Sequence, residues 1–195
     1  MSATHHLGIF GGTFDPVHLG HIHLAILAKE ALGLDEVRFL PCRISPHKTG
    51  TVPASPLDRC EMLRRATADL PWSVVDSSEL DRSGPSYSYQ TAEALAAQYS
   101  DIRLFWIMGS DQWEALPNWK NPERLAKSVE FIVFSRGDWP QPRPGYRLHI
   151  VSGSHPASAT AIRKALAHDE SLPTWLHPAV SAWIEERGLY RTEPG

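Results

Sequence analysis

The chain has 195 residues, which is enough for one compact domain with a substantial core but too few to expect two. Hydrophobic residues make up 42% and charged residues 21%, so the composition excludes a disordered chain. The formal net charge of −3 disfavours a protein that is held to nucleic acid mainly by phosphate neutralisation.

Apolar runs typical of strands alternate with helical patterns along the chain. Leu7–Phe10 is an apolar run ended by Gly11-Gly12, which indicates a buried strand followed by a tight turn. Apolar residues then recur at helical spacing, and Gly33 is placed to end that helix. In chain order the sequence predicts strands at about 7–10, 37–41, 72–75, 103–108, 130–134 and 148–151, and helices at about 18–32, 55–69, 91–99, 158–168 and 178–186.

This alternation predicts a Rossmann-like, three-layer α/β fold around a mostly parallel central sheet. Right-handed crossovers would then place ligands at the carboxyl ends of the strands. The proline-rich stretch 138–146 is interpreted as a loop, because the chain after it is too short to fold alone. We therefore predict a single domain over residues 1–195.

The sequence shows no evident targeting or membrane signal. Its opening residues lack the basic start and long apolar stretch of a signal peptide, and no apolar run approaches membrane-spanning length. Cys42 and Cys60 lack metal-binding spacing and are too few for a disulfide framework. We expect a cytoplasmic protein that binds neither membrane nor nucleic acid, and a homo-oligomer stays open.

The strongest functional signal is the segment from Gly11 to His21, Gly-Gly-Thr-Phe-Asp-Pro-Val-His-Leu-Gly-His, at the junction of the first strand and helix. Glycines let the backbone approach a ligand, and a helix start offers unpaired N–H groups and a positive dipole end, which suit phosphate. His18 and His21 are three residues apart and should project from one face of the helix, while Gly20 leaves room for a nucleotide. Such imidazole donors would hold phosphate oxygens during nucleotidyl transfer.

Simpler interpretations exist for each part of this segment. A single histidine near a helix start is usually a cap or a surface residue, and a Gly-Gly pair alone is only a turn. Two histidines at this spacing can also form a metal pair, but no glutamate lies between them and no third ligand is evident. Their combination at one strand-to-helix junction favours a phosphate site without a dedicated metal site.

A second phosphate-binding pattern lies near the end of the chain. Ser158 is placed to cap a helix, Thr160 lies in its first turn, and Arg163 adds a cation that can fork onto phosphate oxygens. An ordinary capped helix with a surface arginine is the alternative.

The segment from Gly11 to His21 resembles the signature of the HxGH nucleotidyltransferase superfamily, which includes the nicotinate-nucleotide and phosphopantetheine adenylyltransferases. The resemblance implies that His18 and His21 bind ATP phosphates at the transition state. It also implies a nucleotide site lined by the backbone of Gly11, Gly12, Thr13 and Phe14.

The residues around Ser158 resemble the superfamily's I-S-S-T-x-I-R motif, which closes over the ATP phosphates from the side opposite the histidines. Ser158, Thr160 and Arg163 match it. Ala157 and Ala159 depart from it, and Ala159 lacks the hydroxyl of the motif's second serine.

Two further segments resemble the nicotinate-nucleotide adenylyltransferases and concern the acceptor. His47-Lys48 resembles the end of P-P-H-K, with Ser45 in place of the first proline. A lysine in a loop after the second strand can bind a phosphate of either substrate, or it can be one more solvated lysine. The segment around Ser88 and Tyr89 resembles P-S-Y-T-x-D-T, with Gln90 in place of the aspartate. In that family the amide region corresponding to Ser88 meets the carboxylate of the nicotinate ring.

Asp111 and Trp119 match a third pattern, G-x-D followed by tryptophan eight residues after the aspartate. A carboxylate at a strand end can accept hydrogen bonds from ribose hydroxyls, and an indole can stack on an electron-poor pyridine ring. Alternatively, Asp111 merely caps a helix and Trp119 packs in the core.

The resemblance covers nearly the whole chain and implies an enzyme that transfers AMP from ATP to nicotinate mononucleotide, giving nicotinate adenine dinucleotide and pyrophosphate. His18, His21 and Arg163 are the predicted catalytic residues, and Mg²⁺ is expected to enter with ATP rather than in a protein cage. Two alternatives stay open: an adenylyltransferase for nicotinamide mononucleotide or another phosphorylated acceptor, and a nucleotide-binding regulator without catalysis.

Overall fold

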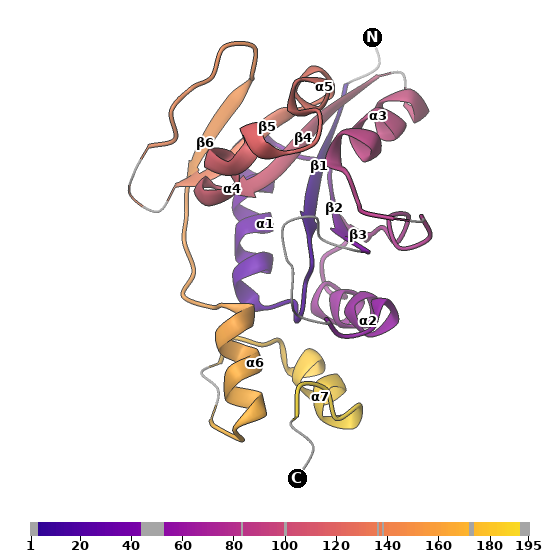
Figure 1. Ribbon diagram of the computed structural model, residues 1–195, viewed down its shortest axis with the longest axis vertical. Helices are drawn as coiled ribbons and strands as arrows, with labels where there is room; N and C mark the ends of the chain where they lie inside the picture. Colours follow the sequence, from indigo (N-terminus) through magenta and orange to yellow (C-terminus); the bar gives the residue numbers. More distant parts are fainter. Residues whose placement is uncertain are drawn as a thin grey trace.

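The computed structural model describes residues 4–43, 53–82, 84–99, 101–135, 137, 139–171 and 174–191. Within these residues one parallel sheet has the strand order β3-β2-β1-β4-β5-β6 (Figure 1). The predicted α/β architecture is confirmed, and the sheet is parallel throughout the part described. The strands are β1 (His5–Gly12), β2 (Glu36–Pro41), β3 (Ser73–Val75), β4 (Ile102–Gly109), β5 (Glu130–Ser135) and β6 (Leu148–Ser152).

Helices cover both faces of the sheet because its strands carry apolar residues toward both sides. One hydrophobic cluster joins the sheet to α1 and α2, and the other joins it to α3, α4 and α5. None of the helices in the described ranges is long and apolar enough to cross a membrane. The helices are α1 (Leu19–Leu32), α2 (Pro56–Ala66), α3 (Ser88–Gln98), α4 (Ser110–Ala115), the 3₁₀ helix η1 (Leu116–Asn118), α5 (Pro122–Ser128), α6 (Ala159–Ala167) and α7 (Pro178–Glu186).

The last two helices, α6 and α7, lie together at the lower end of the molecule in Figure 1, where α1 begins. Ile162 of α6 and Val180 and Ile184 of α7 are buried in the same hydrophobic cluster as α1 and α2. α6 and the segment around α7 are therefore packed near the carboxyl end of β1, where the sequence places the phosphate site.

Several predicted boundaries are wrong by a few residues. Gly11 and Gly12 are still part of β1 and pair with Leu40 and Pro41, so the turn comes after them. α2 ends at Ala66, and α3 begins three residues earlier than expected. The prediction also missed α4, η1 and α5, since helices of three to seven residues are too short to show a clear apolar period.

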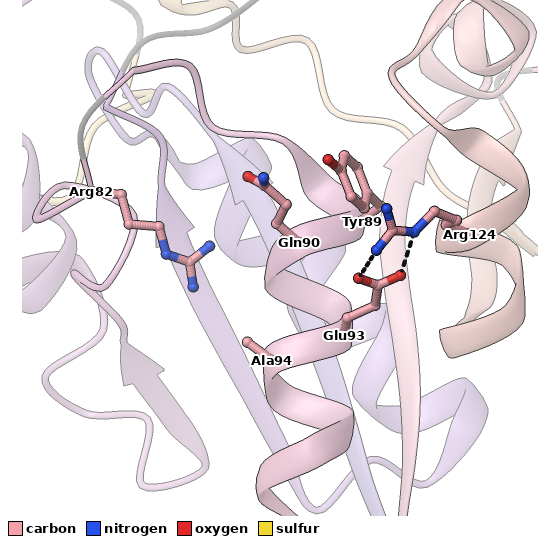
Figure 2. A pocket seen from close by; sticks show the side chains of 6 residues that line it. All are labelled: Arg82, Tyr89, Gln90, Glu93, Ala94 and Arg124. Carbon is pink, nitrogen blue, oxygen red and sulfur yellow. Dashed lines mark hydrogen bonds and ion pairs between the residues drawn. The ribbon is translucent and has the colours of Figure 1, made fainter.

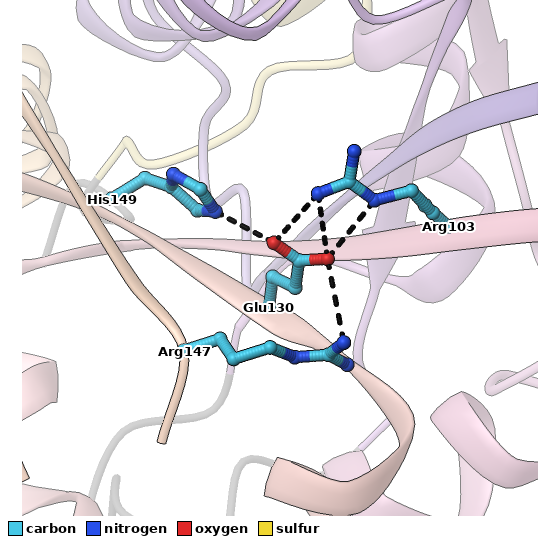
Figure 3. Close-up of polar contacts among 4 residues, drawn as sticks. All are labelled: Arg103, Glu130, Arg147 and His149. Atoms are coloured by element: carbon cyan, nitrogen blue, oxygen red, sulfur yellow. Dashed lines mark hydrogen bonds and ion pairs between the residues drawn. The ribbon is translucent and has the colours of Figure 1, made fainter.

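An ionic cluster ties three strands together at the amino ends of β4, β5 and β6 (Figure 3). The buried carboxylate of Glu130 accepts hydrogen bonds from Arg103 at 2.8–3.0 Å, contacts His149 Nε2 at 2.7 Å and lies 3.6 Å from Arg147. Burial raises the pKa of Glu130, but the hydrogen bonds from His149 and Arg103 outweigh it and hold that pKa below its usual value. This cluster lies at the sheet edge opposite the candidate site.

Candidate active site

The candidate site lies at the carboxyl ends of β1 and β4, where the strand order of the sheet reverses. Such a switch point is where ligands bind in open α/β sheets. Gly11 and Gly12 end β1, and their lack of side chains has a packing reason. A Cβ on Gly11 would lie 3.2 Å from the Trp106 ring, and one on Gly12 would lie 3.1 Å from the Phe14 ring. These glycines let aromatic side chains pack close to the predicted phosphate loop.

A buried arginine that the sequence analysis missed holds this loop in place. The Arg59 side chain, on α2, is fully buried and donates hydrogen bonds to the carbonyl oxygens of Thr13 and Cys42, both at 2.8 Å, and of Ala54 at 3.1 Å. One guanidinium thus joins the ends of β1 and β2 to the start of α2. In the same loop Phe14 is buried with φ of 51°, a backbone region that a bulky residue rarely adopts.

The two histidines come together as their spacing predicts. His18 is the N-cap of α1, and its ring stacks on the ring of His21 with centroids 3.7 Å apart and planes inclined by 26°. The backbone N–H of His18 donates to Nδ1 of His21 at 3.2 Å. A neutral His21 therefore carries its proton on Nε2.

His18 is buried, with 9% of its surface exposed, and its Nδ1 has no hydrogen-bond partner within the part of the chain described. Burial, together with the nearby His155, lowers the pKa of His18 from 6.5 to about 4. A Cβ on Gly20 would lie 2.9 Å from Nδ1 of His18 and 3.3 Å from Cβ of His155. Gly20 is thus needed to seat His18, in addition to its expected role beside a nucleotide.

The start of α1 offers fewer unpaired amides than the sequence suggests. The N–H of Leu19 donates to the carbonyl oxygen of Trp175 at 2.8 Å, and the N–H of His18 is bound to His21. The expectation of an unpaired amide is wrong for Leu19, because the segment before α7 packs on the helix start. A phosphate bound here would therefore rely less on these two amides and more on side chains such as those of the histidines and Arg163.

Arg163 reaches this loop from α6. Its Nη1 donates to the backbone carbonyl oxygen of Asp15 at 2.6 Å and lies 3.8 Å from the carboxylate oxygen Oδ2 of the same residue. Ser158 is the N-cap of α6, as predicted, although its side chain makes no capping hydrogen bond, and the Thr160 side chain is exposed in the first turn. The structure therefore brings Arg163 to the segment that carries His18 and His21.

The residues predicted to contact the acceptor and ribose lie after β4 and at the start of α3. Asp111 is exposed in the first turn of α4, and Trp119 is partly buried after η1, against the second hydrophobic cluster. Ser88 is the first residue of α3. His47 and Lys48 lie outside the described residues.

Tyr89 has a packing role. Its ring is buried beneath the guanidinium of Arg124, at 4.6 Å, and Arg124 is held by two hydrogen bonds to Glu93 of 2.6 and 2.8 Å (Figure 2). Tyr89 and Gln90 line an open pocket on the outer side of α3, which none of the phosphate-loop residues lines. The pocket is lined by Arg82, Tyr89, Gln90, Glu93, Ala94 and Arg124.

Lowering the pH should destabilise the protein through His18. The unfolded chain takes up a proton on this side chain near pH 6.5, and the folded protein takes it up only near pH 4. The stability that depends on a neutral His18 is therefore fully present above pH 6.5 and is lost as the pH falls toward 4. In His18→Asn, the free energy of unfolding should fall by about 2 kcal/mol less than in the wild type between about pH 7 and pH 5.

Urea unfolding at both pH values measures this difference. His23→Asn is the matched control, because His23 is exposed on the same helix. An identical pH dependence in His18→Asn and the wild type would contradict the prediction.

The chain is similar to known proteins in both sequence and fold. The cytidylyltransferase-like family model matches residues 9–165. The probable nicotinate-nucleotide adenylyltransferase of Bacillus mycoides is 38% identical over 193 residues, covering 95% of this chain and 98% of its own. The protein of the same name from Thermus thermophilus is 37% identical over 188 residues, covering 95% and 99%.

The chain belongs to the nicotinate-nucleotide adenylyltransferase family. A solved structure of this family shares the fold: the Plasmodium falciparum nicotinic acid mononucleotide adenylyltransferase complexed with APC has a TM-score of 0.77 and 17% identity, covering 95% of this chain and 97% of its own. The same Plasmodium enzyme complexed with NaAD gives a TM-score of 0.75. The stacked pair of His18 and His21 lies at the switch point of this chain's sheet.

Proposed function

We propose that this protein transfers the AMP part of ATP to nicotinate mononucleotide and releases pyrophosphate, a reaction of NAD biosynthesis. The observation that carries the proposal is family membership over the full chain, with 38% identity to a probable nicotinate-nucleotide adenylyltransferase. The stacked histidine pair at the start of α1, and Arg163, which reaches from α6 to the backbone of Asp15 in the loop before it, support it.

The reaction needs positioning and charge stabilisation more than a protein nucleophile. The 5′-phosphate of the acceptor attacks the α-phosphorus of ATP in line, and pyrophosphate leaves from the opposite side. His18, His21 and Arg163 stabilise the charge on the equatorial and leaving oxygens. A phosphate dianion is already a competent nucleophile near neutral pH, so no general base is needed.

The low pKa of His18 fits such a role. In the ligand-free protein its imidazole is neutral near pH 7, since its pKa is about 4. The negative charge of a bound triphosphate would raise that pKa and favour the protonated ring. The imidazole would then carry a positive charge when the triphosphate is bound and no charge when it is absent.

Mg²⁺ enters as part of the substrate, MgATP, held mainly by phosphate oxygens and water. The acidic side chain of the loop, Asp15, already accepts hydrogen bonds from Tyr190 and from the backbone of Ala54. Its carboxylate is consequently engaged within the protein.

The proposal is tested by mixing the pure protein with MgATP and either nicotinate or nicotinamide mononucleotide, and identifying the dinucleotide by mass. Nicotinate adenine dinucleotide with equimolar pyrophosphate is expected, and chelation of Mg²⁺ should abolish its formation. A strong preference for the nicotinamide substrate would overturn the acceptor. No pyrophosphate release with any mononucleotide would favour a regulator without catalysis.

Trp119→Ala is expected to weaken acceptor binding. Loss of stacking on the pyridine ring should raise the KM for nicotinate mononucleotide about 10-fold, while the KM for ATP changes less than about twofold. Steady-state kinetics with each substrate varied in turn measures the split. Trp72→Ala is the control, because Trp72 is also partly buried but precedes β3 at the far edge of the sheet. A larger rise in the KM for ATP would contradict the stacking role.

A further inference from the structure

The carboxylate of Asp15 lies between the candidate catalytic arginine and the end of the chain. Asp15 is buried, with 7% of its surface exposed. Its Oδ1 accepts hydrogen bonds from the hydroxyl of Tyr190 at 2.7 Å and from the N–H of Ala54 at 3.0 Å. Its Oδ2 lies 3.8 Å from Nη1 of Arg163, which also donates to the Asp15 backbone carbonyl at 2.6 Å. Residues 15, 163 and 190 thus form one connected polar group.

The turn after α7 aims Tyr190 at this group. Gly188 has φ of 59°, and the N–H of Leu189 donates to the carbonyl oxygen of Ile184 at 3.0 Å, which closes the helix end and reverses the chain. Tyr190 itself has φ of 65°, a left-handed conformation that costs free energy for an aromatic residue. Such a conformation persists only where the surroundings impose it, and here the hydroxyl reaches a buried carboxylate.

In the contact between Tyr190 and Asp15, the hydroxyl donates and the carboxylate accepts. Burial, followed by the neighbouring Asp15 carboxylate, raises the pKa of Tyr190 far above its ordinary value of 10, so its hydroxyl stays protonated and donates. With Oδ1 held by Tyr190 and Ala54, the carboxylate presents Oδ2 to Arg163. The Arg163 side chain is 29% exposed, so it is not sealed inside the protein.

We propose that Tyr190 is a positioning residue for Arg163, which it orients through the Asp15 carboxylate. The inference rests on the proposed function, because Arg163 acts on the transferring phosphate. Tyr190 itself touches no reacting atom. The turn after α7, which carries Tyr190, thereby fixes the direction of the Arg163 guanidinium that meets the negative charge of the transition state.

Tyr190→Phe tests the proposal, because it keeps the buried ring and removes only the hydroxyl. The kcat for dinucleotide formation should fall about 10-fold with the KM values close to those of the wild type, and the melting temperature should fall by roughly 5 °C because the buried Asp15 carboxylate loses one hydrogen bond. In an Arg163→Ala background the same substitution should cause no further fall in kcat, since the group that it positions is gone.

Arg187→Gln is the matched control. Arg187 also docks the end of the chain, with its Nε donating to Asp58 at 3.3 Å, but it does not contact Asp15. Its kcat should stay within about twofold of the wild type. An unchanged kcat in Tyr190→Phe, or an equal fall with and without Arg163, would overturn the positioning role. A wild-type protein that forms no dinucleotide would instead overturn the proposed function, and this inference with it.

Discussion

Replacing His18 or His21 by alanine is expected to lower kcat at least about 100-fold, the scale of losing one preorganised donor to a transition-state oxygen. The two rings are stacked 3.7 Å apart, so each variant removes one donor and also the neighbour that orients the other. Single-turnover and steady-state assays with MgATP and nicotinate mononucleotide measure the fall in kcat.

The fold should survive both substitutions, although His21→Ala removes the acceptor of one hydrogen bond, from the backbone N–H of His18. The buried Nδ1 of His18 has no hydrogen-bond partner within the described ranges, so its removal breaks no such bond there. His23→Ala serves as the control, since it removes an exposed imidazole from the same helix and should leave kcat within about twofold. Near-normal turnover in the His18 and His21 variants would refute the catalytic assignment.

Arg59→Met is expected to destabilise the protein by about 3 kcal/mol, the largest loss of stability that we predict. Methionine fills much of the same volume but leaves the carbonyl oxygens of Thr13, Cys42 and Ala54 without their buried donor. Each of these oxygens loses a hydrogen bond from a charged group, and water has little access to them because the Arg59 side chain is fully buried. Urea or thermal unfolding gives the change in the free energy of unfolding.

Arg64→Met is the matched control for Arg59, because it lies on the same helix with 56% of its side chain exposed. Its ion pair with Glu61, at 3.8 Å, is worth only about 0.5 kcal/mol or less at such a surface site. A similar loss of stability in both variants would show that the helix, rather than the buried hydrogen bonds, responds to the substitution. Because Arg59 joins the loop after β1 to α2, its variant should also lose activity below its melting temperature.

Local sequence patterns were sufficient for the parallel α/β architecture. Each central strand is a continuous apolar run, since it is covered on both faces, and Gly33 ends α1 in the left-handed conformation that glycine adopts easily. α7 spans the predicted residues because Pro178 opens it. The short helices α4 and α5 escaped prediction since one or two turns carry too few apolar positions to define a period.

The pairing of His18 with His21 also followed from the sequence, because residues three apart on a helix share a face whatever surrounds them. Arg59 could not be found in this way. Its position in α2 is that of an ordinary polar residue, and its burial depends on carbonyl oxygens from three separate segments. The same holds for the low pKa of His18, which arises from burial and from His155, a residue distant in the chain.

The sequence by itself determined the succession of the strands and longer helices along the chain, the glycine-rich junction and the spacing of its histidines, because these depend on neighbours within a few residues. Only the tertiary structure decided which amides at the start of α1 are engaged, and it alone joined Arg163 and Tyr190 to Asp15 across 148 and 175 residues. Contacts over such separations leave no periodic trace in a sequence, because they depend on where the packed sheet and helices carry each side chain.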